Sequence, residues 1–586
     1  MKNRIKQYLL AASMCVGLTA CSDFFEPIPG VQFGLDETFA SKQRTEEYLN
    51  NVYSYVREVT DAIHPNTYGG IFTEASLDGA NRWNKTYAEW TNGSFNSASA
   101  QASEYFSKYY QAIAKASTFI QNVDKCTEAA ASTRGKWKSE ARALRAYYYF
   151  ELLRLYGPIP LIGEDPIPLD ASLEELIKER NSVDECVNFI ATELQSAIDS
   201  GDLLQRAGKA NLGRMDVATC MALKAKLYLY WASPLFNGNT DQASVKNKDG
   251  KQLFPQTEDN SKWAQARDAY ERFMTFATGQ GYKLTEVYTN GKLDPYASCR
   301  AAGEFFTTTW EAVDELIFVK LRDLYDYTYW VCPKFTDFQD TDVTGGGGYY
   351  TTQETVDLFF TKDGLTIEED PGYDKFEGIP SANNFTSGRY YDPNNPSRLY
   401  FDADKSKVLK QWKDREPRFY VNITYSGSIW LNEGKYNEEM RTDFTNGANG
   451  TCGKSKASGD CPDSGYLIRR GAKASNNNGS KHFSPVLRLA DMYLGYAEAL
   501  CMCSDLDNAL TYLNKIRVRA GIPEYTFTAT VGKITCPKTQ TDLLNRIRRE
   551  RLVELVFEWN RYFDVRRWKV AEGQNDPEHW LYPACI

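Results

Sequence analysis

The chain has 586 residues, of which 42% are hydrophobic and 25% are charged, so it is long enough to bury a large apolar core. Its 77 acidic residues outnumber its 68 basic residues, and the resulting net charge of -9 repels a phosphate backbone and excludes a general nucleic-acid-binding role. After the first 20 residues, no apolar segment approaches the roughly 20 residues that a helix needs to span a membrane.

The N-terminus has the pattern of a bacterial lipoprotein signal. Three basic residues precede the apolar run Tyr8–Ala20, which predicts a signal peptide over residues 1–20. Leu18-Thr19-Ala20-Cys21 resembles the lipobox, in which the cysteine thiol is acylated before cleavage. We therefore expect the mature chain to begin at a lipidated Cys21 that anchors an otherwise soluble body. The alternative is a plain secreted protein with an incidental cysteine.

Five segments before residue 281 are candidate helices. They are Ala112–Val123, Lys136–Tyr156, Ser182–Ile198, Met215–Trp231 and Ala264–Phe276. An amphipathic helix has to cover its apolar face, so we expect these segments to pack on one another and on later helices.

Between Gly281 and Lys481 the pattern changes to short strand-like pieces, polar loops and repeated glycine, asparagine, proline and aromatic residues. Glu315–Leu321 and Arg418–Tyr425 are predicted short strands. The glycine-rich segment Thr344–Tyr350 lacks the lysine and the following helix of a phosphate-binding loop, so we interpret it as a flexible loop. Loops on a rigid scaffold often form binding surfaces.

The C-terminal part of the chain predicts a pair of antiparallel helices. In Ser484–Leu500 the apolar residues from Leu489 onward follow the helical period. A capping box at Ser504 and Asp507 begins a second helix, which Gly521 and Pro523 end. Such a pair is the unit of a tetratricopeptide-like repeat, and it has to stack on neighbours, which predicts an α-solenoid core.

Six segments in this order resemble the SusD/RagB family of outer-membrane nutrient-binding lipoproteins. They are Ser139–Ile162, Thr351–Ile367, Asp414–Trp430, Leu487–Leu500, Leu513–Pro523 and Arg548–Trp568. Together they span most of the chain after Cys21. The family often has glycine where Trp559 stands and asparagine where Cys501 stands, and both departures fall on predicted scaffold helices.

The resemblance implies a mostly α-helical fold, in which a tetratricopeptide-like helical-repeat scaffold carries a loop-rich, partly β remainder. One SusD-like domain would cover residues 21–586, with helical portions at 21–280 and 482–586 and a loop-rich portion at 281–481. The resemblance also implies a lipid-anchored, surface-exposed outer-membrane protein that binds oligo- or polysaccharide. Such a protein delivers its ligand to a SusC-like TonB-dependent transporter and acts as its lid.

Two segments combine aromatic residues with polar neighbours, as a sugar site needs. The resemblance places the ligand surface in these same regions of the chain. The first segment supplies the candidate ligand-binding residues Asp78, Asn81, Arg82, Trp83 and Trp90, and the second supplies Tyr325, Tyr329 and Trp330. The alternative for each aromatic residue is ordinary core packing.

Two other functional classes stay open. Glu550, Glu554 and Glu558 are spaced one helical turn apart, and a glycoside hydrolase uses paired carboxylates of this kind. The arginines interleaved with them favour instead an ion-pair network that braces helix packing. A helical-repeat scaffold that binds only proteins is the other class. Because the only histidines are His64, His482 and His579, we expect no metal site and no cofactor. The sequence does not decide whether the protein binds a structural calcium ion. We expect no enzymatic activity.

Overall fold

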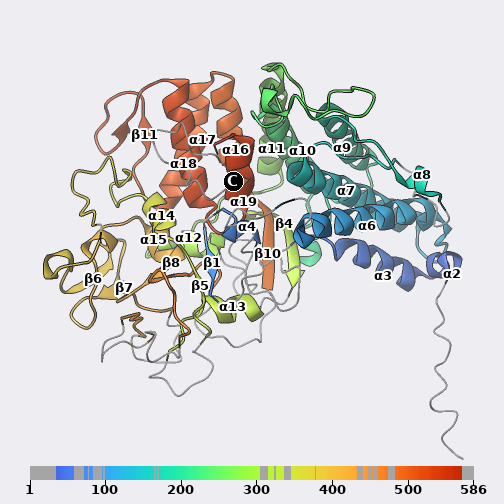
Figure 1. Ribbon diagram of the computed structural model, residues 1–586. Helices are drawn as coiled ribbons and strands as arrows, with labels where there is room; N and C mark the ends of the chain where they lie inside the picture. The colour runs from blue at the N-terminus through green and yellow to red at the C-terminus, as the bar shows by residue number, and fades with distance from the viewer. Residues whose placement is uncertain are drawn as a thin grey trace, which may run out of the picture.

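The computed structural model describes residues 34–57, 71–76, 78–82, 96, 99–163, 167, 171–303, 314–322, 325–335, 345–376, 378–431, 440–445, 452, 459–472 and 482–570. The predicted signal peptide and Cys21 lie outside these residues. The described part contains seventeen α-helices and a few short strands, so the predicted mostly α-helical fold is confirmed (Figure 1). No helix in these ranges combines the length and the hydropathy required to cross a bilayer.

All five helices predicted before residue 281 are present. The helices of this part are α2 (Leu35–Ala40), α3 (Lys42–Tyr53), α4 (Ile71–Glu74), α6 (Ala100–Asn122), α7 (Ala131–Tyr156), α8 (Leu173–Leu176), α9 (Val183–Asp199), α10 (Val217–Ala232) and α11 (Ser261–Gly279). The largest difference is in α6, which begins at Ala100 and not at Ala112. A capping box between Ser182 and Glu185 begins α9 at the predicted place.

The C-terminal elements continue the helical array. They are β10 (His482–Arg488), α16 (Leu489–Met502), α17 (Leu506–Ala520), β11 (Tyr525–Thr526), β12 (Ile534–Thr535), α18 (Gln540–Glu554) and α19 (Asn560–Arg567). The helix predicted from Ser484 begins only at Leu489, because residues 482–488 form a strand that pairs with β4 (Leu316–Arg322). Pro485, which a helix interior disfavours, pairs with Val319 in that ladder.

The ends of α17 test the predicted start and stop signals separately. The predicted capping residue Ser504 has a φ of 64°, and the N-cap is instead Asp505, whose side chain accepts a hydrogen bond from the Asn508 backbone N–H. The predicted capping box at Ser504 is therefore wrong, and the N-cap lies one residue later. Gly521, with a left-handed φ of 75°, ends the helix as predicted.

Neighbouring helices in the chain are also neighbours in space. Helix α6 packs on α7, α7 on α9, α9 on α10 and α10 on α11, and α16 then packs on α11, α17 and α18 (Figure 1). This succession is the tetratricopeptide-like scaffold that the sequence predicts. The contact between α11 and α16 joins the N-terminal and C-terminal helices into one array.

The middle of the chain adds short helices and strands to one side of this scaffold. They are β2 (Tyr288–Thr289), β3 (Lys292–Leu293), α12 (Pro295–Gly303), α13 (Tyr325–Val331), α14 (Gln353–Leu358), β6 (Arg389–Asp392), β7 (Asn395–Asp402) and α15 (Pro417–Asn422). A four-stranded antiparallel sheet has the order β1 (Ala80–Asn81), β5 (Tyr349–Tyr350), β9 (Tyr466–Ile468) and β8 (Ile423–Tyr425).

The two predicted strands of this portion had different outcomes. Glu315–Leu321 is confirmed as β4. The prediction for Arg418–Tyr425 is wrong over its first part, because residues 417–422 form α15 and only residues 423–425 form β8. Pro417 stands in the first turn of α15, where its fixed φ favours a helix and its missing N–H has no cost.

One continuous cluster of buried hydrophobic side chains runs through the N-terminal helices, the middle portion and the C-terminal helices. It extends from Phe39 on α2 to Trp568 after α19. The division of the chain at residues 280 and 481 stays a prediction.

Candidate functional site

Two sequence segments that supplied candidate ligand residues meet at one stretch of four glycines, Gly345–Gly348. The Gly346 and Gly348 N–H groups donate hydrogen bonds of 2.8 and 3.1 Å to the carbonyl oxygens of Tyr329 and Trp330 at the end of α13. On the other side, the Arg82 N–H donates a 3.0 Å bond to the Gly348 carbonyl oxygen. The fold therefore brings the first segment, at β1, next to the second, at α13.

The four glycines are buried, and at Gly345 and Gly346 a larger residue would not fit. A Cβ on Gly346 would lie 2.6 Å from Cε3 of the Trp330 ring, and one on Gly345 would lie 2.4 Å from the Tyr329 carbonyl oxygen. Their N–H groups satisfy carbonyl oxygens that the last turn of α13 leaves without helical partners. Our interpretation of this segment as a flexible loop is corrected accordingly: it is a packed support for α13.

Tyr329 and Trp330 form the aromatic part of the site. Both side chains are half-buried, and their ring centroids are 5.0 Å apart at an interplanar angle of 86°, a T-shaped pair. Tyr327, one turn earlier, is buried, and its hydroxyl donates a 2.8 Å bond to the Arg470 carbonyl oxygen. The side chain of Tyr325 lies outside the described residues. Tyr329 and Trp330 thus offer partly open ring surface on a helix that Tyr327 fixes.

Arg82 supplies the polar part of the site. Its side chain is 18% exposed, forms an ion pair with Asp463 and donates a 3.3 Å bond to the Cys461 carbonyl oxygen. The half-buried Tyr350 lies nearby. Its burial raises the pKa of its hydroxyl, and the negative charge of the neighbouring Asp463 carboxylate raises that pKa further. We call Arg82, Tyr329, Trp330, Tyr350 and Asp463 the candidate surface.

The sequence reasoning missed Tyr350 and Asp463. Tyr350 is the second of two tyrosines that follow the glycine run, so the available signal was an aromatic pair at the end of a segment that we interpreted as a loop. Asp463 carried no signal of its own, because it reaches Arg82 only through the pairing of β1 with β5 and of β5 with β9.

The prediction that Asp78 and Asn81 contact a ligand is corrected, because both side chains are buried. The Asp78 side chain is 1% exposed, and its carboxylate accepts a 2.7 Å bond from the Arg561 guanidinium. Burial raises the pKa of Asp78, and the facing Arg561 charge opposes that rise. Asn81 is also buried, opposite Tyr349 in the sheet. Both residues support the candidate surface from within. Trp83 and Trp90 lie outside the described residues and stay predictions.

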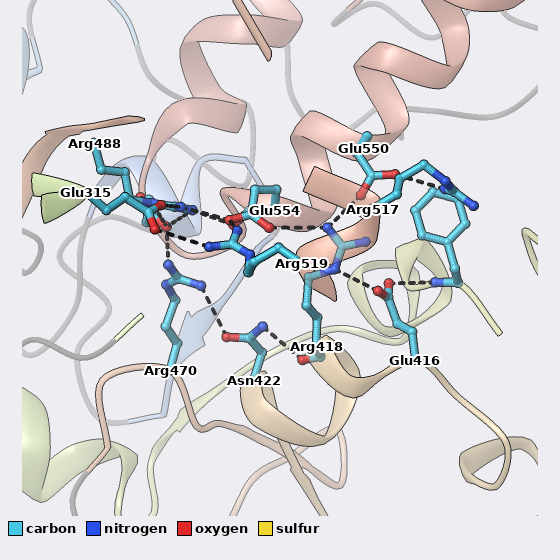
Figure 2. A network of polar contacts seen from close by, with 12 residues as sticks. Glu315, Glu416, Arg418, Asn422, Arg470, Arg488, Arg517, Arg519, Glu550 and Glu554 are labelled. Carbon is cyan, nitrogen blue, oxygen red and sulfur yellow. Dashed lines mark hydrogen bonds and ion pairs between the residues drawn. The ribbon is translucent and has the colours of Figure 1, made fainter. Parts of the chain in front are cut away.

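The three glutamates that suggested a hydrolase belong to a buried ion-pair network, in which Figure 2 labels Glu550 and Glu554. Glu550, Glu554 and Glu558 are no more than 8% exposed. Their arginine partners come from other elements: Arg418 on α15, Arg470 after β9, Arg488 at the end of β10, and Arg517 and Arg519 on α17.

The short ion pairs of this network connect buried elements and brace the packing between them. Arg488 lies 2.8 Å from carboxylate oxygens of Glu315, Glu554 and Glu558, and Arg418 lies 2.6 Å from Glu550. Burial by itself would raise the pKa of Glu554, but the three arginines around it outweigh burial and hold that pKa well below its usual range. A hydrolase needs a carboxyl group that reaches substrate and carries a proton near neutral pH. The predicted bracing role is therefore confirmed.

The partners differ from those that the sequence suggested. The arginines close in sequence to the glutamates pair elsewhere: Arg551 with Asp491 and Asp564, Arg561 with Asp78, and Arg567 with Glu498. Arg566 lies over the Tyr562 ring at 3.7 Å. Within the described ranges, no group of three or more His, Cys, Asp or Glu residues is arranged to hold a metal ion.

Two family models match this chain. The model described as "SusD family" matches residues 315–579, and a SusD-like model described as "Starch-binding associating with outer membrane" matches residues 32–229. A solved structure named BT4246 superposes with a TM-score of 0.72 at 25% identity and covers 91% of this chain and 90% of that chain. The chain belongs to the SusD family.

Two other SusD-like proteins also match this chain. A SusD-like protein from Bacteroides ovatus is 27% identical over 175 residues, and the match spans only 30% of that relative's length and 29% of this chain. The SusD-like protein BF3747 from Bacteroides fragilis has a TM-score of 0.64 at 22% identity, covering 91% of this chain and 88% of its own, and so shares the fold.

One departure from the SusD family pattern has a backbone explanation. Trp559, where the family often has glycine, has a left-handed φ of 63°, a conformation that glycine adopts without strain. The tryptophan side chain is nevertheless buried, and the Arg57 guanidinium lies 5.1 Å from its ring centroid. Burial of the indole ring offsets the local strain in this member of the family.

Replacing Glu554→Gln tests the bracing role. The change leaves buried arginine charge without its partner, so we expect the free energy of unfolding in urea to fall by about 3–5 kcal/mol at pH 7. Because the pKa of Glu554 is depressed in the folded state, its contribution is present above the usual carboxyl pKa of about 4.3 and is lost as the pH falls. The difference from wild type should therefore shrink below about pH 4.

Glu46→Gln on α3 is the matched control, because Glu46 is exposed on a helix surface. It should change the unfolding free energy by less than about 0.5 kcal/mol. A folded Glu554→Gln variant of wild-type stability that has lost a sugar-releasing activity of the wild type would instead support the hydrolase.

Proposed function

We propose that this protein captures oligo- or polysaccharide at the cell surface and passes it uncut to a SusC-like TonB-dependent transporter, which it covers as a lid. Membership of the SusD family supports the class of function, and one matching family model is described as starch-binding and associated with the outer membrane. The observation that carries the proposal for this chain is the candidate surface, where a half-buried aromatic pair lies close to a charged, partly exposed rim.

The chemistry of that surface fits a sugar. A pyranose ring presents flat arrays of C–H groups surrounded by hydroxyls, so it pairs with an aromatic face and with hydrogen-bonding groups beside it. Tyr329 and Trp330 supply the rings, and Arg82, Tyr350 and Asp463 supply donors and acceptors. The packed glycine segment beneath them holds these groups in place before a ligand arrives, which lowers the ordering cost of binding.

The anchor and the lid belong to the same proposal. Lipidation at Cys21 would tether the chain to the outer membrane, since several acyl chains anchor a protein stably where one chain does not. A binding protein feeds the cell only if a pore takes up the captured ligand, and the family resemblance implies that a SusC-like transporter would be that pore. The helical-repeat scaffold that binds only proteins is the competing function, because the α6–α11 array also fits that class.

Trp330→Ala tests the candidate surface. Removing one stacking ring should weaken binding of the matching polysaccharide about 5-fold to 150-fold in calorimetry, by analogy with base–aromatic stacking. Trp83→Ala and Trp90→Ala belong in the same series, with circular dichroism to verify folding. Tyr391→Ala is the control, because Tyr391 is an exposed aromatic residue on β6, which lies apart from α13 in Figure 1. Affinity that survives all three tryptophan changes would contradict the assigned surface.

Cys21→Ala tests the anchor. Without the thiol there is no acylation, so the protein should move from the membrane fraction to the soluble fraction. The body buries its own core, and its thermal unfolding should stay unchanged. The two fractions are compared by immunoblotting after a high-salt wash. A variant that stays with the membrane is held by something other than the lipid.

Co-purification tests the lid. We expect a SusC-like barrel to accompany the protein in mild detergent, because delivery requires contact between the two. Recovery of the protein alone, from an extract in which other such complexes survive, combined with failure to bind any polysaccharide, would favour the protein-binding scaffold.

A further inference from the structure

A cleft that we call the basic cleft lies at the C-terminal end of α7. It has a volume of about 430 Å³, which is within the roughly 300–1,000 Å³ of small-molecule sites. Its walls come from residues 154–157, from several residues of the loop between α10 and α11, and from the last turn of α19. No residue of the candidate surface lines it.

Basic side chains outnumber acidic ones in this cleft. Arg154, Arg180, Arg566 and Lys569 line it, and Asp241 is the one carboxylate residue among its described lining residues. The whole chain has a net charge of -9, so the local balance of charge is the reverse of the overall balance. A concave surface with excess positive charge attracts a negatively charged ligand.

Two of the four cations have carboxylate partners inside the protein. The Arg154 guanidinium lies 2.6 Å from the Glu151 carboxylate, and the Lys569 ammonium lies 2.5 Å from the Asp241 carboxylate. The one carboxylate that lines the basic cleft is therefore already paired.

The other two cations, Arg180 and Arg566, have no carboxylate partner in the part of the chain that the structure describes. Arg566 is half-buried, lies over the Tyr562 ring at 3.7 Å and donates a 3.4 Å bond to the Tyr562 carbonyl oxygen. Arg180 is exposed, and its carbonyl oxygen accepts a 2.9 Å bond from the Asn247 side chain, which holds its backbone beside the cleft. Because neither side chain is fully buried, a ligand in the cleft can reach both.

Partly open apolar surface lies beside these cations. Tyr156, Leu235 and Val245 line the basic cleft, and each is half-buried, so each leaves part of its surface to a ligand. The Tyr156 ring stands at 90° to the Phe106 ring with the centroids 5.4 Å apart, a contact that fixes its orientation. A sugar ring can lay its C–H face on such a surface while an acidic substituent reaches a guanidinium group.

We infer that the basic cleft is a second carbohydrate site, which takes an acidic saccharide whose carboxylate or sulfate groups bind Arg180 and Arg566. Guanidinium groups bind such oxyanions through charge-assisted, often paired, hydrogen bonds. A neutral ligand would leave the two charges without partners, and an inorganic anion would leave the apolar wall unused. The inference rests on the proposed function for the saccharide class of the ligand, but it uses none of the residues of the candidate surface.

The test measures binding to the full-length chain in detergent by calorimetry, with trigalacturonic acid, a sulfated galactotriose, neutral galactotriose and triglutamate as separate probes. Arg180→Gln and Arg566→Gln each remove one positive charge and keep a polar side chain. Arg272→Gln on α11 is the matched control, because Arg272 is an exposed arginine that does not line the cleft.

We expect at least one acidic trimer to lose affinity about 10-fold or more in both cleft variants, since each change removes a charge-assisted hydrogen bond, while Arg272→Gln stays within about 2-fold of wild type. Loss for trigalacturonic acid alone identifies a carboxylate as the bound group, and loss for the sulfated trimer alone identifies a sulfate. Affinity of every acidic trimer within about 2-fold of wild type in either cleft variant would overturn the inference. Triglutamate bound as tightly as the acidic trimers would make the cleft a peptide-docking surface and overturn it too.

A purely structural role for Arg566 gives a different result. Arg566 stands in the last turn of α19, where a cation also stabilises the helix end, so thermal unfolding is recorded for every variant. An Arg566→Gln variant that unfolds at a lower temperature but keeps its affinity would overturn the inference. Arg180 lies outside any helix, so loss of affinity in Arg180→Gln with an unchanged unfolding temperature reports a ligand contact.

The outcomes also separate this inference from the proposed function. Loss of affinity in Trp330→Ala alone would keep the candidate surface and overturn the basic cleft as a site. Loss in the two arginine variants alone would keep the basic cleft and overturn the candidate surface. If the wild type binds neither acidic trimer, the basic cleft is overturned, while the proposed function is still decided by the wider polysaccharide series.

Discussion

A buried network of five arginines and five glutamates holds the C-terminal helices against the middle of the chain (Figure 2). Its fifth glutamate is Glu416, which pairs with Arg418 at 2.6 Å and joins Glu315, Glu550, Glu554 and Glu558. Removing ten charges from water is costly, and the cost is offset only when each charge meets its partners in good geometry. The network joins α15, α17 and α18 to the start of β4 and the end of β10. A different packing of any of these elements would leave a buried charge unpaired, so the network restricts the fold to one arrangement.

The candidate surface is attached to this network. Arg470, paired with Glu558, accepts at its carbonyl oxygen the hydroxyl of Tyr327 on α13, the helix that carries Tyr329 and Trp330. The aromatic groups therefore stand on supports that run back to the same rigid interior, and such support is what a preformed site requires.

The helical scaffold was largely predictable, and the candidate surface was only half predictable. Helical periodicity located α7, α9, α10 and α11 to within a few residues, because an amphipathic pattern is a local property. The types of residue in the two segments identified Arg82, Tyr329 and Trp330 as candidate ligand contacts. Nothing local distinguished the partly open Tyr329 from the buried Tyr327, or identified Asp78 as the partner of Arg561. These differences depend on what the rest of the chain places around each residue.

By itself, the sequence determined the helical segments, the end of α17 at Gly521, the lipoprotein-like N-terminus and the six segments that resemble the SusD family, because each depends on neighbouring residues or on residue order. Only the tertiary structure decided the partners of Glu550, Glu554 and Glu558 and the packed role of Gly345–Gly348. Ion pairs and cavities form between side chains that are distant along the chain, and their energies depend on burial, which a single sequence does not display.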